Sequence, residues 1–570
     1  MKKWMALLLA AAMCTAMMAG CGSEPASEET GSQESTQETT ETPAASETET
    51  ESESGSKVLT YNLAADPKTL DPNLNSSSDG SKVLVNEFEG LLRDKSDGNG
   101  PQPAMAAEMP QVVENADGTV TYTFTLRDAN WSDGVPVKAQ DFVFDYQRMV
   151  DPATAAEYAY MMAPILNAEE IIAGEKDKSE LGVKAIDDKT LEITLKHTCG
   201  YFEGLLCHPT YLPLREDVVG TDVDGLWAKD PEKIVSNGPF TLTEYTMGDQ
   251  LVLTKNPEYW DAENVNLDQL VFKMIVDEGT SLTAFHNGEV DMITDTIPAE
   301  EVQQLIATGE CQLYPLLNAT YYKINAQTEI EALQDVRVRK ALSMAIDRKA
   351  LVENVTRSGE APAMGLVPYG MTVADGSTDF RDYAGSYYLT EEAQLEEAKA
   401  LLAEAGYPEG EGIPTIQILY NTKDLNKSVA EAIQEMWKEL GIQVELVNQE
   451  WAVFQDNLVG LQYPAIARDS WSGDYTDPMT FMDMYTSGNV QSACGYANPA
   501  YDEQIAIAAN SQGEEHFAAY AEAERVIMED AYIIPLYYSQ MKVCMSPSIT
   551  GVGIDSLGKL WFGNADIVAE

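Results

Sequence analysis

Cys21 is the residue whose type and setting point most directly to chemistry, the attachment of a lipid to its thiol. Lys2 and Lys3 come directly after the first methionine, an apolar run follows, and the run ends at Ala19-Gly20-Cys21. This order is typical of a bacterial export signal with a lipid-accepting cysteine, and the run is shorter than a transmembrane helix requires. We expect residues 1–20 to be removed, which places the protein on the outer face of the cytoplasmic membrane. Cleavage near Ala19, giving a secreted protein without lipid, is the alternative.

Catalytic motifs are absent from the rest of the sequence. Only four histidines occur, and neither HExxH spacing, a Walker A loop, a GxGxxG turn nor a GxSxG elbow is present. Carboxylates are so abundant that a pair of acids of the kind used by glycosidases cannot be singled out. We therefore expect no catalytic residue, no metal and no cofactor, with an exported hydrolase kept as an alternative.

Five cysteines lie outside the expected signal and lipid site. They form no CxxC pair and have no zinc-type spacing with histidine; they are Cys199, Cys207, Cys311, Cys494 and Cys544. We expect free buried thiols, and a bridge between Cys199 and Cys207 is the alternative.

The charge balance excludes one large class of partners. The 570 residues include 36 basic and 93 acidic ones, for a net charge of −57. A surface of this sign repels nucleic acid, so we expect neither DNA nor RNA as a partner. Residues 22–56 carry glutamates, no lysine or arginine and almost nothing apolar, which predicts a disordered acidic linker over residues 21–56.

Strand and helix patterns are mixed along the body of the chain, which starts near Val58. Alternating apolar and polar residues predict strands, after a turn at 116–119 in one case, over 120–128, 189–196 and 250–256. Apolar residues at helical spacing predict helices over 335–355, 389–407, 427–442 and 514–530. We expect Thr390 to cap the second of these, and Gly406 and Gly441 to end the second and third. The body is therefore an α/β or α+β protein with more than one lobe.

Ten segments, in order and spanning roughly residues 57–550, resemble one known family. The chain is similar to the extracellular solute-binding proteins of peptide ABC transporters, the dipeptide/oligopeptide/nickel-type family 5, and most to its oligopeptide-binding members. The segments are 64–73, 131–160, 181–195, 236–245, 256–261, 321–327, 335–348, 446–451, 468–478 and 533–538.

The resemblance implies a type II-like periplasmic binding protein fold, α/β, with two lobes, a hinge and three domains. Domain I would comprise 57–88, 213–317 and 541–570; domain II, 89–212; and domain III, 318–540. A hinge would lie near 317–319 and 538–541.

The implied function is capture of short peptides, without bond cleavage, and their delivery to a permease driven by ATPases. A monomer held to the membrane only by its lipid is expected. Alternatives are the same scaffold binding nickel, haem or an oligosaccharide, and a receptor for a peptide pheromone. Scarce histidine disfavours nickel.

The resemblance also implies a binding site. Asp474 matches the residue that pairs with the α-ammonium of the peptide, as a buried ammonium requires. Arg468 matches an arginine that meets the carboxylate of short peptides, and Asn426 stands where a relative has a histidine near that carboxylate. The remaining expected ligand-binding residues are Trp451 in a side-chain pocket, Tyr158 in the cavity wall, Ser76 and Ser78 on a segment whose backbone would pair with the peptide, and Trp471 and Tyr475 beside Asp474.

The chain departs from its relatives at several of these places. The resemblance places Asn318 and Ser472 where an oligopeptide-binding protein of this family has a disulfide. Lys323 replaces an acidic residue next to the peptide, Ser539 a pocket tyrosine, and Thr356 a lysine near one end of the peptide. Side-chain preference therefore cannot be carried over from the relatives.

Overall fold

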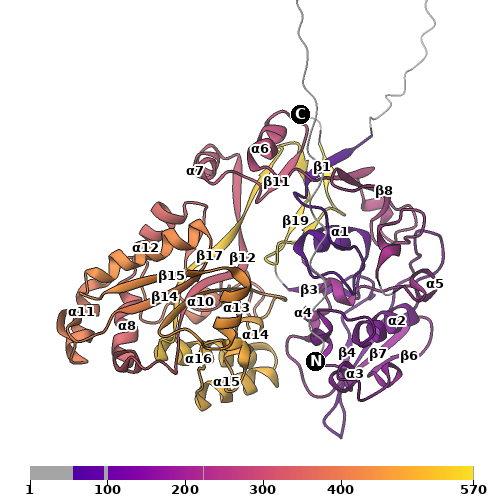
Figure 1. Ribbon diagram of the computed structural model, residues 1–570. Coiled ribbons are helices and arrows are strands. Elements are labelled where there is room, and N and C mark those ends of the chain that lie inside the picture. Colours follow the sequence, from indigo (N-terminus) through magenta and orange to yellow (C-terminus); the bar gives the residue numbers. More distant parts are fainter. Residues whose placement is uncertain (1–55, 96–99, 223, 569–570) are drawn as a thin grey trace, which may run out of the picture. The chain divides into compact units, whose positions relative to one another are not determined.

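The structure is a computed structural model that describes residues 56–95, 100–222 and 224–568 (Figure 1). The predicted signal, Cys21 and nearly all of the acidic linker lie outside these residues. Within the described part of the chain, no helix is both long and apolar enough to cross a membrane.

The largest sheet mixes parallel and antiparallel strands. Its order is β15-β14-β16-β12-β17-β11-β1-β10-β9-β8, and β13 pairs with β17. The strands are β1 (Val58–Asn62), β8 (Phe240–Thr246), β9 (Gln250–Lys255), β10 (Gln269–Lys273), β11 (Met292–Thr294), β12 (Cys311–Ile324), β13 (Ala361–Pro362), β14 (Ile416–Asn421), β15 (Val444–Gln449), β16 (Ile466–Ser472) and β17 (Ile533–Met545). Its strands come from distant parts of the sequence, so the sheet joins the two ends of the body.

Strands β12 and β17 connect the two halves of this sheet. They are antiparallel and in regular register from Cys311, opposite Cys544, to Pro315; the register shifts between Pro315 and Ala319. Figure 1 shows α6 and α7 beside β11 at one end of these strands, and α8, α11 and α12 beside β14 and β15 at the other.

A separate four-stranded antiparallel sheet follows the order β4-β5-β7-β6. It consists of β4 (Gln111–Glu114), β5 (Val120–Thr125), β6 (Val183–Ala185) and β7 (Thr190–Leu195). The turn predicted at 116–119 joins β4 and β5, and buried and partly exposed residues alternate along β7 as expected for a half-buried strand. Smaller pairs join β2 (Leu92–Asp94) to β3 (Pro101–Pro103), β18 (Ile549–Thr550) to β21 (Asp566–Ile567) and β19 (Gly553–Ile554) to β20 (Leu560–Trp561).

Helices pack on the sheets and form the links between them. They are α1 (Ser78–Glu87), α2 (Ala139–Val150), α3 (Ala168–Ile172), α4 (Phe202–Leu205), α5 (Glu216–Val219), α6 (Glu278–His286), α7 (Ala299–Thr308), α8 (Val336–Met344), α9 (Arg348–Leu351), α10 (Phe380–Ala384), α11 (Leu395–Glu404), α12 (Asp424–Lys438), α13 (Trp451–Val459), α14 (Met479–Met482), α15 (Pro499–Ala509) and α16 (Gly513–Asp530).

The helix predicted over 335–355 is wrong as a single element. It is broken into α8 and α9, because Asp347 leaves the helical conformation and its side chain accepts a hydrogen bond from the backbone of Ala350. Buried Arg348 then donates to the carbonyl oxygens of Ser343 and Pro535. Asp347 therefore caps a new helix, and the apolar spacing alone did not indicate that a helix begins there.

The predicted start of the next helix is also wrong, whereas its end is confirmed. Thr390 does not cap α11, which begins only at Leu395. Backbone hydrogen bonds from Arg348 to the Glu391 carbonyl and from Gln394 to the Met344 carbonyl hold 391–394 against the α8–α9 junction. Gly406 follows the helix at a φ of 94°, which glycine adopts without strain.

Two further helix predictions and the cysteine prediction are confirmed. Gly441 has a φ of 76° just after α12, which starts three residues earlier than expected, and α16 covers the predicted 514–530. The five described cysteines are free and buried.

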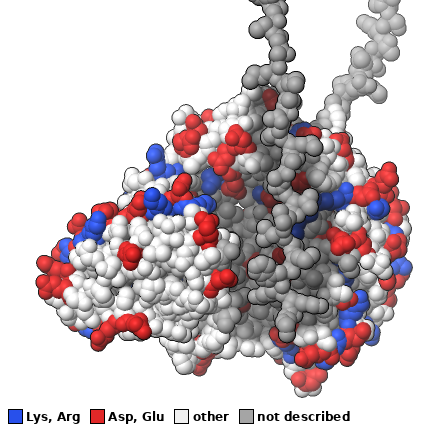
Figure 2. Space-filling model, in the orientation of Figure 1, with Lys and Arg blue, Asp and Glu red and all other residues white. Residues whose placement is uncertain are grey.

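On the visible part of Figure 2, acidic and basic side chains are interspersed rather than gathered in one basic patch.

Candidate functional site

Asp474 lies where two cavities meet, two residues beyond the end of β16. Its backbone N–H donates to the Thr480 hydroxyl at 2.9 Å, and Gly473 donates to the Leu317 carbonyl oxygen at 2.7 Å. The carboxylate accepts a hydrogen bond from the Tyr160 hydroxyl at 3.1 Å. The loop that carries Asp474 is therefore fixed by backbone bonds, and its carboxylate faces the region of 158–162.

The first cavity, here called the aromatic cavity, measures about 330 Å³. Tyr201 and Tyr475 stack in it at a centroid distance of 5.2 Å. Its other lining residues include Tyr160, Trp471, Asp474, Thr480, Asp483 and Gln491. Its size and its mixture of aromatic walls with a few polar groups are typical of small-ligand sites.

Two carboxylates give the aromatic cavity its charge. Burial raises the pKa of Asp474, and the Tyr160 hydrogen bond offsets part of that rise. Burial, together with the neighbouring Asp474, raises the pKa of Asp483 to about 6. Among the described residues, neither carboxylate has a lysine or arginine partner. At neutral pH the cavity is therefore anionic and suited to a cationic group.

The second cavity, here called the serine-lined cavity, measures about 280 Å³. The segment before α1 contributes Ser76 and Ser77, and Ser78 is the first residue of the helix. The Ser77 hydroxyl caps α1 by accepting from Gly80 at 3.3 Å. The other lining residues are Ser81, Tyr158, His208, Pro209, Ser472, Gly473, Asp474, Leu557, Gly558 and Lys559. Because Ser78 is helical, its backbone does not continue an extended strand.

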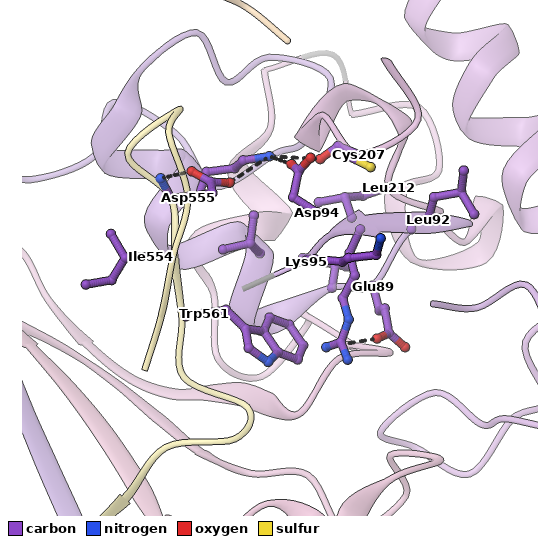
Figure 3. A pocket seen from close by; sticks show the side chains of 15 residues that line it. Glu89, Leu92, Asp94, Lys95, Cys207, Leu212, Ile554, Asp555 and Trp561 are labelled. Atoms are coloured by element: carbon purple, nitrogen blue, oxygen red, sulfur yellow. Dashed lines mark hydrogen bonds and ion pairs between the residues drawn. The ribbon is translucent and has the colours of Figure 1, made fainter. Parts of the chain in front are cut away.

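Lys559 lines the serine-lined cavity, but its charge is already matched. Its ammonium lies 2.7 Å from Asp94 and 3.3 Å from Asp555. Figure 3 shows both carboxylates pointing toward that ammonium, beside Cys207. Burial alone would lower the pKa of Lys559, yet the two aspartates raise it above its ordinary value. The lysine therefore does not cancel the charge of Asp474 and Asp483.

His208 is the histidine that lines the serine-lined cavity. Its ring packs on Tyr158 at 5.0 Å, and its Nδ1 accepts from the Thr210 backbone at 3.3 Å. Burial, with a smaller effect of Lys559, lowers its pKa to about 3. An imidazole of such low basicity suits packing better than proton abstraction near pH 7. No cluster of three or more potential metal ligands occurs in the described chain.

Arg468 lies outside both cavities, four residues before the end of β16. It is partly buried opposite Tyr322 of β12 and next to Tyr537. Its Nε has no hydrogen-bond partner among the described residues. The neighbouring Asp469 pairs instead with buried Lys323 at 2.6 Å. Lys323, where a relative has an acidic residue, is therefore held within the protein.

Trp451 and Asn426 are not brought to the cavities. Trp451 begins α13, is 57% exposed and stacks on Phe454 at 6.1 Å, so it is neither core nor cavity wall. Asn426 is buried in the first turn of α12, where its amide donates to the Asn421 side chain at 2.8 Å. Of the nine predicted residues, the structure groups six around the two cavities: Asp474, Trp471, Tyr475, Tyr158, Ser76 and Ser78. Their role in binding stays a prediction.

Hydrogen bonds join the residues at the site of the missing disulfide. Asn318 and Ser472 are directly opposite in the β12–β16 ladder, and the Asn318 amide donates to the Ser472 hydroxyl at 2.8 Å. Ser539 donates to Asn318 at 2.7 Å.

Thr356, which stands where a relative has a lysine near one end of the peptide, donates a hydrogen bond to Glu360 at 2.7 Å.

Sequence reasoning missed Tyr160, Tyr201 and Asp483. Tyr160 lies two residues after Tyr158, in a 3-10 turn over Ala159–Met162. Two tyrosines at this spacing are only a weak indication of a binding site. Tyr201 and Asp483 reach the aromatic cavity from segments more than 280 positions apart. No local pattern marks such a meeting.

Comparisons with known proteins agree on the family. Residues 100–493 match the model for bacterial extracellular solute-binding proteins, family 5. The periplasmic oligopeptide-binding protein OppA of Salmonella typhimurium is 35% identical over 92% of this chain and 95% of its own.

Solved structures give the same result. The murein tripeptide-binding protein MppA in its unliganded open form has a TM-score of 0.78 at 31% identity, covering 91% of this chain and 98% of its own. Haemophilus influenzae OppA in complex with RPPGFSPFR has a TM-score of 0.67 at 30% identity, covering 90% and 99%. The expected two-lobed, type II-like α/β fold is thereby confirmed. The chain belongs to the bacterial extracellular solute-binding proteins of family 5.

Proposed function

We propose that the protein is the lipid-anchored binding component of an ABC importer and captures short peptides between two lobes. The relatives named as oligopeptide-binding proteins, matched over nearly their whole length, support peptide as the ligand class. The anionic aromatic cavity supports an amine-bearing ligand, with Asp474 receiving its α-ammonium. Capture and delivery to a permease require no bond cleavage.

The observation that carries the proposal is a free strand edge next to Asp474. β12 pairs with β16 along 466–472, whereas β14 pairs with β16 only at Ile466 and Ala467. Within the described residues, the other edge of 468–472 has no strand partner. An extended peptide can add to such an edge through its backbone, which accepts many side chains.

The separation of Asp474 and Arg468 indicates how much extended peptide could lie between them along this edge. They are six residues apart, which corresponds to about 20 Å of extended chain. A short peptide with its ammonium at Asp474 would direct its carboxylate toward Arg468. In this proposal the lobes follow the three expected domains, 57–88 with 213–317 and 541–570, 89–212, and 318–540, and close by a hinge near 317–319 and 538–541.

Calorimetry with trialanine and with N-acetyl-trialanine tests the anchor. Asp474→Asn should weaken trialanine binding by about 2–5 kcal/mol, because the ammonium loses its charge partner. Asp117→Asn, in the exposed β4–β5 turn, is the matched control and should leave binding unchanged. The acetylated peptide should bind weakly to all three proteins. Equal trialanine affinity of the wild type and Asp474→Asn would refute the role of Asp474.

The competing functions give different results in a second experiment. The protein is incubated with a mixed peptide pool, and bound and free peptides are identified by mass spectrometry. Retained, uncleaved peptides support the proposal, whereas shortened peptides would indicate a hydrolase. Retention of nickel, haem or an oligosaccharide in place of peptide would assign the scaffold to another solute.

A further inference from the structure

Cys311 and Cys544 face each other across two neighbouring strands. Cys311 is the first residue of β12, and Cys544 lies directly opposite it near the end of β17. Their exposed fractions are 3% and 0%. Both belong to a small apolar cluster with residues of α6, α7 and β11, including Leu282, Val302 and Ile293. The two thiols are therefore neighbours in a dry environment.

The ladder supplies the geometry that a disulfide needs. Directly opposed residues of an antiparallel pair have Cα atoms about 4.5–5.5 Å apart and side chains on the same face. Disulfides span Cα separations of about 4.4–6.8 Å, so the register of the ladder places the two cysteines within the range of a disulfide. Cys199, Cys207 and Cys494 lie on other segments: the first two flank α4, and the third precedes α15.

The two thiols also differ in acidity. The neighbouring thiol of Cys544 lowers the pKa of Cys311 below its ordinary value. The same contact, together with burial, raises the pKa of Cys544. This difference exists only in the folded cluster, so it does not determine which of the two thiols reacts first in the unfolded chain.

We propose that Cys311 and Cys544 form a cross-strand disulfide when the chain folds in the presence of a small-molecule disulfide. The thiolate of one of the two cysteines attacks one sulfur of that disulfide and releases its other half as a thiolate. The thiolate of the other cysteine then attacks the protein sulfur of the mixed disulfide and releases the second half. The protein loses two hydrogen atoms, and the external disulfide is reduced to two thiols. Because both cysteines are buried in the folded chain, the first attack precedes the closing of the cluster.

The position of the bond determines what it constrains. It joins the regular stretch of the β12–β17 ladder and lies on one side of the register shift between Pro315 and Ala319. It also closes a long loop that contains β13 to β16 and Asp474. Closing a long loop restricts the unfolded chain, so the oxidised protein should be more stable than the reduced one. Since the bond leaves the other side of the register shift unconstrained, trialanine affinity should be the same in both forms.

Refolding in a glutathione redox buffer tests the proposal. The full chain is unfolded in denaturant with reductant, refolded with glutathione disulfide, alkylated and digested. We expect a linked pair of peptides that contain Cys311 and Cys544, and a higher melting temperature than for the chain refolded with reduced glutathione. The comparison of the two wild-type forms does not depend on any variant folding.

Serine variants locate the bond. Cys311→Ser and Cys544→Ser should each lack the linked pair and the rise in melting temperature. Cys494→Ser, another buried cysteine, is the matched control and should keep both. Full alkylation of Cys311 and Cys544 after oxidative refolding of the wild type, or linkage of either to another cysteine, would overturn the proposal.

Discussion

The Tyr160 hydroxyl donates a hydrogen bond to the Asp474 carboxylate over 3.1 Å. Tyr160 follows α2 and the irregular segment after it, whereas Asp474 follows β16, so the contact joins parts of the chain more than 300 residues apart. It stabilises the charged form of a carboxylate that burial destabilises. Tyr160 is thus part of the charge balance at the proposed amine site.

Tyr160→Phe removes this hydrogen bond and keeps the ring. A hydrogen bond to a charged group contributes about 1.5–3 kcal/mol, so trialanine affinity should fall by up to that amount. Tyr158→Phe is the control, because Tyr158 forms no hydrogen bond to Asp474 in the described structure, and its affinity should change less. Calorimetry at constant pH measures both. A larger loss for Tyr158→Phe than for Tyr160→Phe would contradict the assignment.

The affinity for peptide should depend on pH through Asp483, whose pKa of about 6 is raised by burial and by Asp474. A raised carboxylate pKa means that the negative charge is present above pH 6 and is lost as the pH falls through 6. The α-ammonium of the ligand stays protonated over this range. Trialanine affinity should therefore decrease from pH 7 to pH 5.

Asp483→Asn isolates this contribution. The variant should bind more weakly than the wild type at pH 7 and should lose much of the change between pH 7 and 5. Asp117→Asn should keep the wild-type profile. Calorimetry at matched ionic strength measures the profiles. A wild-type profile in Asp483→Asn would show that another group titrates.

Periodicity predicted the elements of this fold better than it predicted their ends. The strand around 190–195 is marked by strict alternation, and α16 by apolar spacing, so local sequence was sufficient for both. The end of α8 and the start of α11 were missed, because backbone hydrogen bonds between Arg348 and Glu391, and between Gln394 and Met344, determine them. Such tertiary contacts cannot be recognised from ten neighbouring residues of the sequence.

The site shows the same limit. Asp474, Trp471 and Tyr475 lie in one short segment, and one family motif was enough to propose them together. Asp483 was missed because its proposed role depends on Tyr160 and Tyr201. These two residues lie far earlier in the sequence, and the fold brings them to the same cavity. Trp451 was proposed from its motif alone, yet the start of α13 leaves it exposed.

Stability should depend strongly on a buried ion pair within 318–540. Arg381 and Glu524, 2% and 0% exposed, form two bonds of 2.7 Å, and Glu524 also accepts from Leu366 and Val367. Glu524→Ala leaves Arg381 as an uncompensated buried charge, so the free energy of unfolding should fall by about 3–5 kcal/mol.

The same helix supplies the control for this prediction. Glu522 pairs with Arg525 at 2.6 Å, but Arg525 is exposed and Glu522 is partly exposed. Glu522→Ala should therefore cost less than about 1 kcal/mol. Urea denaturation followed by circular dichroism compares the two variants. Equal losses of stability would contradict the expectation that breaking the buried ion pair costs more than breaking the surface pair.

Membrane attachment is predicted to depend on the thiol of Cys21 and not on the folded body. Cys21→Ser removes the lipid acceptor, so the protein should move from the membrane fraction to the soluble fraction of expressing bacteria. Trialanine affinity should stay at the wild-type value, because the body from Val58 onward contains the proposed site. Cys494→Ser, a buried cysteine of the body, should leave the protein in the membrane fraction. Cell fractionation with immunoblotting, followed by calorimetry on the released protein, measures both effects. Retention of Cys21→Ser in the membrane would refute the lipid anchor while leaving the peptide site untouched.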